Sequence, residues 1–430
     1  MEIHGKWFFK ELGNVGYQGV LYLSEKHNKL EIIDNLPISN YPVRFTYVYG
    51  KTIEGDFTLI NVIYQGNFRN NYKSGLVFKT LYCSEIIRGK FLNEEHELEC
   101  KKFEFEIDGL KEWFNHNCIS EQQENGSVLK IEYKKPETLH ILIQNWGKLL
   151  FDFDESSSFA KDEYNTIYQL KQFATIILET NQKENYKSFI SLSNKIKIFF
   201  YLIFGIETEI LKQSFYDENN GNELIYFTEY KDVIHNFNNH SEFVIQYIEI
   251  KDDFEKIINA FIDTFLKLKP TLNIWINFLA NDKLKDENTF LFSCQALEAW
   301  HRTFMEDKEK YIKGEFNNKF GTPYFKTRIK KILEYFENEF KIIVFQEENM
   351  TFDNTAEIIT NTRDYYTHHL KEVKKMWNEN QILNYTPILI KLIHILMLDN
   401  IGVDRKYLMS YFNSIFFSKY TDIYKIPLLS

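Results

Sequence analysis

Apolar and polar residues alternate with a period of two through about the first 145 residues of the chain. The alternating runs are short, rich in β-branched and aromatic residues, and separated by turn-forming pairs such as Asp108-Gly109. We therefore expect residues 1–145 to form an antiparallel β sandwich or barrel. The clearest predicted strands are 19–23, 30–33, 57–64, 76–81, 102–107 and 128–133.

The apolar spacing changes to three and four near residue 150, which is typical of amphipathic helices. Residues 158–213 and 226–280 show this spacing, as between Ile167 and Leu170. We predict a helical middle region over residues 146–280.

Residues 281–430 keep the helical spacing and are expected to form an all-α bundle. Within them, Ile388–Leu398 is apolar nearly all round, so it is expected either at the centre of a bundle or at a subunit interface. The predicted helices are 289–305, 324–344, one beginning near Thr362, one beginning after Pro387, and 405–417.

Composition and charge limit the possible functions. Of the 430 residues, 44% are hydrophobic, which excludes a globally disordered chain. The chain has 51 basic and 61 acidic residues, so it is not a generally basic nucleic-acid coat. Residues 281–430 contain 21 of each kind, which leaves the whole negative charge on residues 1–280. A surface that binds a polyanion is therefore expected in the C-terminal part.

The four cysteines are widely spaced and form no CxxC pair, which is typical of a reducing cytosol. The first residues show no signal-peptide pattern, and the longest apolar run, near 198–206, is too short for a membrane span of about 20 residues. We predict a cytoplasmic protein without a membrane partner. Because no convincing group of metal ligands is present, we expect neither a metal nor a cofactor.

Gly50-Lys51-Thr52 has the letters that end a phosphate-binding loop. That loop needs a glycine where Phe45 stands, and a helix should follow it, whereas this region has strand patterning. A hairpin turn is the favoured interpretation.

Chemically active residues recur at helical spacing in the segment 361–377. On an ideal helix Arg363, Asp364 and His368 lie on one polar face with Lys371 and Lys375, and Asp364 is a surface neighbour of His368. The core face of the same predicted helix carries Tyr366, Leu370, Val373 and Trp377.

This group of residues is suited to RNA cleavage without a metal. A histidine can take a proton from a 2′-hydroxyl or give one to the leaving 5′-oxygen, and a guanidinium can hold the phosphate. A carboxylate can orient the imidazole. A solvated helix face with an incidental histidine has the same pattern, and both interpretations stay open at this level.

The run Arg363-Asp364-Tyr365-Tyr366-Thr367-His368 resembles the Arg-x4-His motif of HEPN ribonuclease domains, and the ApeA-like subgroup in particular. Asp364 stands where that subgroup usually has Asn. Residues Gln295–Arg302 resemble the first HEPN helix of the group. The N-terminal half is similar to the ApeA N-terminal domain at Gly5-Lys6-Trp7, Gly50-Lys51-Thr52 and Leu110-Lys111-Glu112-Trp113.

The resemblance implies an α+β multidomain protein with a β-rich sensor or regulatory domain at 1–145, the helical middle region, and a HEPN-like ribonuclease domain at 281–430. It implies a metal-independent endoribonuclease of abortive antiphage defence that cuts RNA, with tRNA anticodon loops as the expected target and a phage protein as the trigger. HEPN sites are usually formed by two domains. Because one straight helix separates Arg363 and His368 by about 140°, a homo-oligomer through the HEPN domain is expected.

In this interpretation His368 is the general acid and base, Arg363 binds the phosphate and Asp364 orients His368. Lys371, Lys375 and Glu298 are candidate substrate-binding residues, although Glu298 and Arg302 also have the spacing of an ordinary helix surface pair. The alternative is a non-catalytic HEPN-type sensor or dimerisation scaffold.

Overall fold

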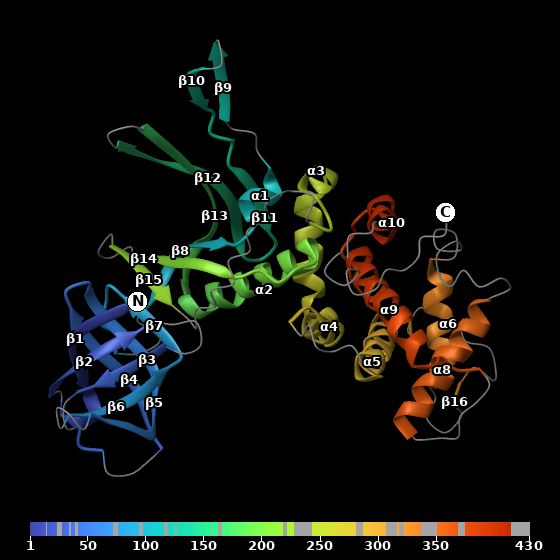
Figure 1. Ribbon diagram of the computed structural model, residues 1–430, viewed down its shortest axis with the longest axis horizontal. Helices are drawn as coiled ribbons and strands as arrows, with labels where there is room; N and C mark the ends of the chain where they lie inside the picture. The colour runs from blue at the N-terminus through green and yellow to red at the C-terminus, as the bar shows by residue number, and fades with distance from the viewer. Residues whose placement is uncertain are drawn as a thin grey trace. The chain divides into compact units, whose positions relative to one another are not determined.

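The computed structural model divides the chain into two compact units (Figure 1). The first consists of Met1–Ile198 and Thr208–His240, and the second of Phe199–Glu207 and Ser241–Ser430. The structure describes residues 1–13, 15–23, 28–33, 36–38, 42–71, 76–93, 98–115, 119–124, 127–161, 166–217, 222–227, 243–280, 287–306, 316–317, 322–336, 351–368 and 375–413.

The first strands close into an antiparallel barrel, as the alternating pattern predicts. They pair in the order β5-β4-β1-β2-β3-β6, and β6 pairs back onto β5. Side chains such as Trp7 and Phe9 fill the interior and are fully buried. The strands are β1 Glu2–Phe9, β2 Gly16–Tyr22, β3 Asn28–Ile32, β4 Val43–Thr52, β5 Gly55–Asn71 and β6 Leu76–Cys83, with a short 3-10 helix at Lys10–Leu12.

Gly50-Lys51-Thr52 ends strand β4 and leads into the hairpin to β5, so the hairpin interpretation is confirmed. A Cβ atom at Gly50 would overlap the indole ring of Trp7. The glycine therefore makes room for a core aromatic side chain instead of approaching a phosphate.

Strand β5 belongs to two pairings because it is long. Its first part, Phe57–Ile60, pairs with β7, and its second part pairs with β6. From β7 the antiparallel sheet continues in the order β15-β14-β8-β13-β12-β11 (Figure 1). These strands are β7 Glu85–Arg88, β8 Glu99–Ile107, β11 Leu139–Ile143, β12 Gly147–Lys161, β13 Thr166–Asn185, β14 Ile210–Asp217 and β15 Asn222–Phe227. A separate hairpin joins β9 Ile119–Glu124 to β10 Ser127–Tyr133, and α1 is Leu110–Phe114.

The helix predicted over the segment around Ile167 and Leu170 is wrong, because these residues lie in strand β13. Along this strand Ala174, Ile176 and Leu178 are buried on one face with a period of two. Apolar residues on the opposite face, such as the partly exposed Phe173, create the spacing of three and four. Strands therefore continue past residue 145 as far as Phe227.

The predicted middle region contains the helices α2 Tyr186–Phe204, α3 Tyr247–Ile250 and α4 Phe254–Ala280, but strands β12, β13, β14 and β15 also lie within it. The predicted fold class, an antiparallel β barrel followed by helical regions, is confirmed.

The described C-terminal helices lie close to the predicted ones in the sequence, but several of their boundaries differ. Helix α5 is close to the predicted 289–305, whereas α8 begins ten residues before Thr362. Helix α9 begins at a capping box formed by Asn378 and Gln381, so Pro387 lies inside this helix and not in its first turn. The elements are α5 Glu287–Phe304, β16 Phe316–Asn317, β17 Thr322–Pro323, α6 Phe325–Tyr335, α8 Phe352–His368, α9 Glu379–Asn400 and α10 Arg405–Asn413. The predicted extensions over 337–344 and 414–417 lie outside the described residues.

The apolar segment of α9 is part of the centre of the bundle. Residues Leu392–Leu398 are all buried, and α9 packs against α4, α5 and α10. Glu379–Asn400 has the length and mean hydropathy (1.4) of a membrane span, but 61% of that stretch is buried inside the protein. Of the two expectations for Ile388–Leu398, the structure shows the bundle centre.

Candidate functional site

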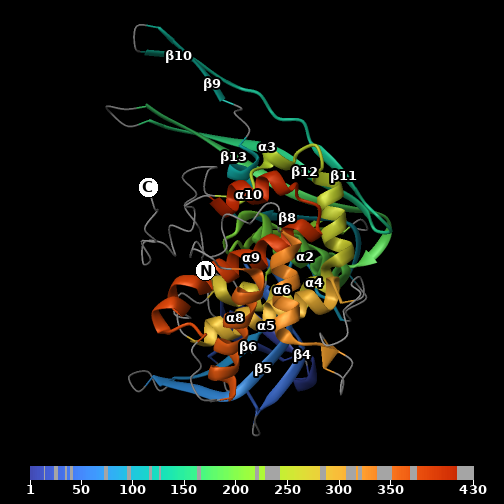
Figure 2. The same cartoon turned by 90° about the vertical axis from the view of Figure 1, so that its right-hand side faces the viewer.

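Arg363, Asp364 and His368 lie in the last turns of α8, which packs beside α5 and α6 (Figure 1, Figure 2). The helix ends at His368, so the prediction that it continues to Trp377 is wrong. Its buried face consists of Thr355, Ala356, Ile359 and Thr362, which is the spacing of an amphipathic helix.

The chain that follows α8 turns back onto the same helix. The hydroxyl of Thr362 donates to the carbonyl of Ile358 (2.7 Å) and accepts from the backbone N–H of Trp377 (2.9 Å). The amide of Asn361 donates to the carbonyl of Lys375 (2.9 Å). Trp377 is buried against Phe290 of α5. The core contact predicted for Trp377 is thus made from this returning segment.

The guanidinium of Arg363 is held on three sides by neighbouring groups. It lies over the ring of Phe325 at 4.3 Å, with Nη2 3.7 Å from Glu298 Oε2 and Nη1 3.4 Å from Asp364 Oδ1. The side chain is 26% exposed. A stacked, flanked guanidinium has few rotamers left, so Arg363 is oriented before any ligand arrives.

Glu298 connects three arginines from three helices. Its Oε1 lies 2.8 Å from Arg302 Nη2 and 3.9 Å from Arg328 Nε, and its Oε2 lies near Arg363. The surface pair expected between Glu298 and Arg302 is present, but it is only part of what this carboxylate contacts.

Arg328 of α6 is the buried member of this set, with 1% of its side chain exposed. Its guanidinium binds Glu306 in two-pronged fashion (2.9 and 3.3 Å), and its Nε donates to the carbonyl of Pro323. Its Nη1 lies 3.3 Å from His301 Nδ1. Since a guanidinium only donates, Nδ1 of His301 accepts. We call Arg328, Glu298, Glu306 and His301 the Arg328 group.

Burial and the neighbouring Arg328 charge lower the pKa of His301 to about 4, so this histidine is neutral near pH 7. Around Arg363, the charges of Arg302, Arg328 and Arg363 are matched by those of Glu298, Glu306 and Asp364. The described part of this cluster is therefore electrically balanced and not strongly basic.

Sequence reasoning missed Phe325, Arg328, His301 and Glu306. One signal was available for Arg328, because it lies four residues before Ile332 on the apolar stripe of a predicted helix. A charged residue in such a position is usually buried with a partner.

His368 is exposed at the end of α8 and makes no hydrogen bond or ion pair with the residues that the structure describes. Asp364 contacts Arg363, and no hydrogen bond to His368 is found within the described chain. Five helical positions separate Arg363 from His368, which corresponds to about 7.5 Å along the axis and about 140° around it. A single copy of α8 therefore does not bring the two side chains to one point.

The lysines predicted on the same face are placed differently. Lys375 lies after the end of α8 and forms an ion pair with Glu357 (3.3 Å). Lys371 lies outside the described residues. Lys375 could contact a ligand only in competition with Glu357.

A second buried polar group lies on α9. His394 Nε2 is 2.7 Å from the carbonyl of Leu202 and must donate to it, so Nδ1 accepts from the hydroxyl of Tyr411 (2.9 Å). The imidazole also stacks on Trp275 at 4.4 Å. Burial lowers the pKa of His394 to about 4. We call these residues the His394 group; its imidazole is fully buried, which suits a role in packing.

Metal ligands and thiols are the other side chains that could carry chemistry. Within the described ranges, no group of three or more His, Cys, Asp and Glu side chains is placed to hold a metal ion. Cys83, Cys100 and Cys294 are buried and form no disulfide, and Cys118 lies outside the described residues. Burial raises the pKa of the Cys294 thiol, which disfavours the thiolate needed for nucleophilic chemistry.

Comparison with protein families gives two matches along the chain. ApeA N-terminal domain 1 matches residues 2–261, and Apea-like HEPN matches residues 291–407. The second match contains Arg363, His368 and the whole Arg328 group. No curated protein and no solved structure matches the chain. The chain therefore belongs to the ApeA family, which at the family level makes it a HEPN-type nuclease of antiphage defence.

Proposed function

We propose that this protein is a metal-independent endoribonuclease that cuts tRNA in the anticodon loop. It acts in the cytoplasm in abortive infection, after a phage protein has engaged its N-terminal sensor region. One observation carries the proposal: α8 presents an exposed His368 and a pre-oriented Arg363 within the matched HEPN segment. The nuclease domain is proposed to lie within residues 281–430.

The proposed reaction is an internal transesterification. The 2′-oxygen attacks the adjacent phosphorus, the bond from phosphorus to the 5′-oxygen breaks, and the products are a 2′,3′-cyclic phosphate and a 5′-hydroxyl. His368 takes the proton of the 2′-hydroxyl, or gives one to the leaving oxygen. Arg363 binds the phosphate as charge builds up in the transition state. No metal hydroxide is needed, because the nucleophile belongs to the substrate.

The active site is proposed to be shared by two chains. Arg363 is anchored toward α5 and α6, whereas His368 is exposed at the helix end, so the two groups diverge within one chain. A second copy related by a two-fold axis would supply the missing partner, so that Arg363 of one chain and His368 of the other face the same phosphate. The buried position of Leu392–Leu398 leaves this part of α9 out of the proposed interface.

Further residues are proposed to act in binding the RNA. Asp364 is proposed to orient His368 in the assembled site, and Lys371, Lys375 and Glu298 to contact or position RNA. Lys375 would exchange Glu357 for a phosphate.

Substitution of the two motif residues tests the proposal. His368→Ala and Arg363→Ala should each lower the rate of tRNA cleavage by about 10²–10⁴-fold. Thr367→Ala is the matched control, since Thr367 is exposed on the same helix turn. Cleavage at the normal rate by a folded His368→Ala protein would refute the assignment of the acid and base.

The metal requirement and the product ends test the chemistry. Cleavage should persist in excess EDTA, and the 3′ ends should carry a 2′,3′-cyclic phosphate or its hydrolysis product. Activity lost in EDTA and restored by Mg²⁺ would replace this mechanism with a metal-dependent one.

Mixing two inactive variants tests the shared site. An Arg363→Ala chain and a His368→Ala chain should regain part of the activity when combined, because one site of the mixed dimer contains both intact groups. A fully active monomer at every concentration, as measured by light scattering, would exclude pairing.

A non-catalytic HEPN-type sensor or dimerisation scaffold is the second candidate. It is favoured by the two carboxylates, Glu298 and Asp364, that lie within 4 Å of Arg363 and could compete with a phosphate. Growth arrest on expression of the active form, relieved by His368→Ala, would favour the enzyme; equal effects of both proteins would favour the scaffold.

A further inference from the structure

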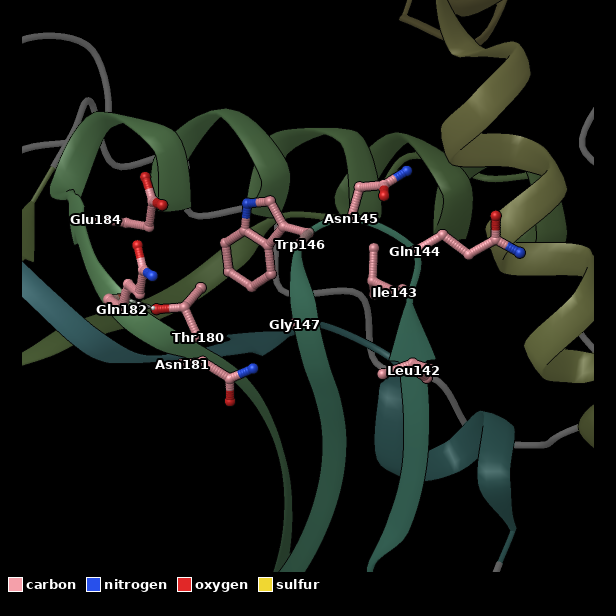
Figure 3. Close-up of a pocket in the computed structure, with 10 residues that line it drawn as sticks. All are labelled: Leu142, Ile143, Gln144, Asn145, Trp146, Gly147, Thr180, Asn181, Gln182 and Glu184. Carbon is pink, nitrogen blue, oxygen red and sulfur yellow. Dashed lines mark hydrogen bonds between the residues drawn. The ribbon is translucent and has the colours of Figure 1, made fainter.

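A pocket of about 410 Å³ lies in the N-terminal unit, and all of its lining residues belong to that unit. It is formed by the turn that joins β11 to β12 and by the last part of β13 (Figure 3). Residues 142–147, 180–182 and Glu184 line it. Its volume is within the range of small-ligand sites, which is roughly 300–1,000 Å³.

The backbone on both sides of this pocket is irregular in a defined way. The pairing of β13 with β8 shifts register between Glu179 and Glu184, and the hydroxyl of Thr180 donates to the carbonyl of Gln182 (2.7 Å). On the opposite side Asn145 has a left-handed backbone in the turn (φ 59°), and a Cβ at Gly147 would overlap the carbonyl of Glu179. The backbone of the bulge and that of the turn are therefore closely packed against each other, and the side chains of both segments line the pocket.

Trp146 is the fixed aromatic surface of the pocket. Its ring packs edge-to-face on Phe189 of α2, with centroids 5.1 Å apart and an interplanar angle of 86°. In Figure 3, Glu184, Gln182 and Thr180 stand on one side of the indole, and Asn145 and Gln144 on the other.

The remaining lining is rich in acceptors. It contains four side-chain amides and one carboxylate, and none of the described lining residues is basic. The side chains of Asn145, Asn181, Gln182 and Glu184 form no hydrogen bond or ion pair with the described parts of the chain. These groups are available to a ligand.

We propose that this pocket binds an organic cation, that is, a guanidinium or ammonium group on a larger carrier. The indole face attracts a cation, the Glu184 carboxylate compensates its charge, and the amide oxygens accept its N–H groups. A phosphate or nucleotide is disfavoured, because the lining offers one negative charge and the N-terminal part of the chain is acidic.

The cation can come from a basic side chain of a polypeptide or from a free polyamine, since both present the same chemistry. The proposed binding of a cation does not depend on the proposed nuclease function.

Calorimetric titration of the full-length protein tests the site. The probes are the peptide acetyl-Ala-Arg-Ala-amide, the same peptide with neutral citrulline in place of arginine, and spermidine. Loss of the charge should weaken binding about tenfold or more. Binding of the arginine peptide or of spermidine identifies the source. Equal binding of the citrulline peptide, or no binding of any cation, would overturn the proposal.

Variants locate the binding. Glu184→Gln keeps the shape of the side chain and should weaken the cation about tenfold, and Trp146→Leu should also weaken it. Glu137→Gln is the control, because Glu137 is an exposed carboxylate outside the lining. If Glu137→Gln weakens binding as much as Glu184→Gln, the cation is attracted by general surface charge and the site is refuted. If Trp146→Leu does not fold, the comparison of Glu184→Gln with Glu137→Gln is sufficient to test the site.

Because this titration contains no RNA, its failure leaves the proposed nuclease untouched, and a failed cleavage assay leaves the cation site untouched.

Discussion

The Arg328 group and the His394 group both place a neutral histidine inside the helical unit, yet only the first one contains charges. In the His394 group every partner is an uncharged backbone, hydroxyl or aromatic group, and the imidazole is fully enclosed. In the Arg328 group a buried guanidinium is linked through Glu298 to Arg302 and Arg363, which reach the surface. The closed group can serve packing alone, whereas the charged group connects the core to the candidate site.

Removal of the buried charge should have the largest effect on stability. Arg328→Met removes the buried guanidinium that binds the partly exposed Glu306 and the carbonyl of Pro323, and we expect a loss of about 3 kcal/mol in the free energy of unfolding. Urea denaturation followed by circular dichroism measures it. Lys330→Met on the same helix, with a partly exposed ion pair, should cost less than about 1 kcal/mol. Equal effects of the two variants would show that the burial of Arg328 carries no special weight.

The His394 group should make the stability of the protein depend on pH in the acidic range. The pKa of His394 is about 4 in the folded protein and about 6.5 when unfolded, so below pH 6.5 the unfolded chain binds the extra proton first. Stability is therefore full above pH 6.5 and falls as the pH is lowered to 4, by about 3 kcal/mol for this residue.

Thermal melts between pH 7 and pH 4.5 test the acid sensitivity. His394→Gln retains an amide donor and acceptor but does not titrate, so its melting temperature should depend less on pH than that of the wild type. His140→Gln, on an exposed position of β11, should not change the dependence. An unchanged slope in His394→Gln would assign the acid sensitivity elsewhere.

Substitutions of Phe325 should show whether its ring positions the Arg363 guanidinium for cleavage. Phe325→Leu removes the ring beneath Arg363, and an interaction of about 0.5–2 kcal/mol corresponds to a loss of roughly 2- to 30-fold in cleavage rate. Phe325→Tyr retains a ring and should restore the rate. If both variants cleave like the wild type, the stacking does not position Arg363.

The smallest effect is expected at the exposed edge of the charged group. Arg302 is 59% exposed although its Nη2 lies 2.8 Å from Glu298, so Arg302→Ala should change stability by about 0.5 kcal/mol or less. A loss above about 2 kcal/mol in urea denaturation would mean that Arg302 is a structural member of the Arg328 group.

The sequence predicted secondary structure correctly where the hydrophobic pattern had a single period. Alternation predicted the barrel strands, and the apolar stripe predicted α5, because in both cases the buried face follows a single period. In β13 both faces carry apolar residues, so the pattern imitated a helix. At α9 the capping box of Asn378 outweighed Pro387, whose ring is tolerated inside the helix.

The candidate site was predictable only in part. Arg363, Asp364 and His368 were found because they are close in the sequence and lie on one helix. The contacts that orient Arg363 come from Phe325 on α6 and Glu298 on α5, and such pairings depend on tertiary packing. Local spacing holds no information about these pairings, which is also why Glu306 was missed. For Arg328 the spacing did hold a signal, its place on the apolar stripe of α6, but not the identity of its partner.

The double hydrogen bond of Thr362 has a consequence for chain entropy. Its hydroxyl joins α8 to the backbone of Trp377, 15 positions later, and so closes a loop that contains His368. Closing a flexible loop of this length costs about 2 kcal/mol. In this protein the hydrogen bonds of the buried Thr362 hydroxyl help to offset that free-energy cost when the chain folds, before RNA is bound. The cost of bringing residues 375–377 onto α8 therefore does not have to be subtracted from the affinity for the substrate.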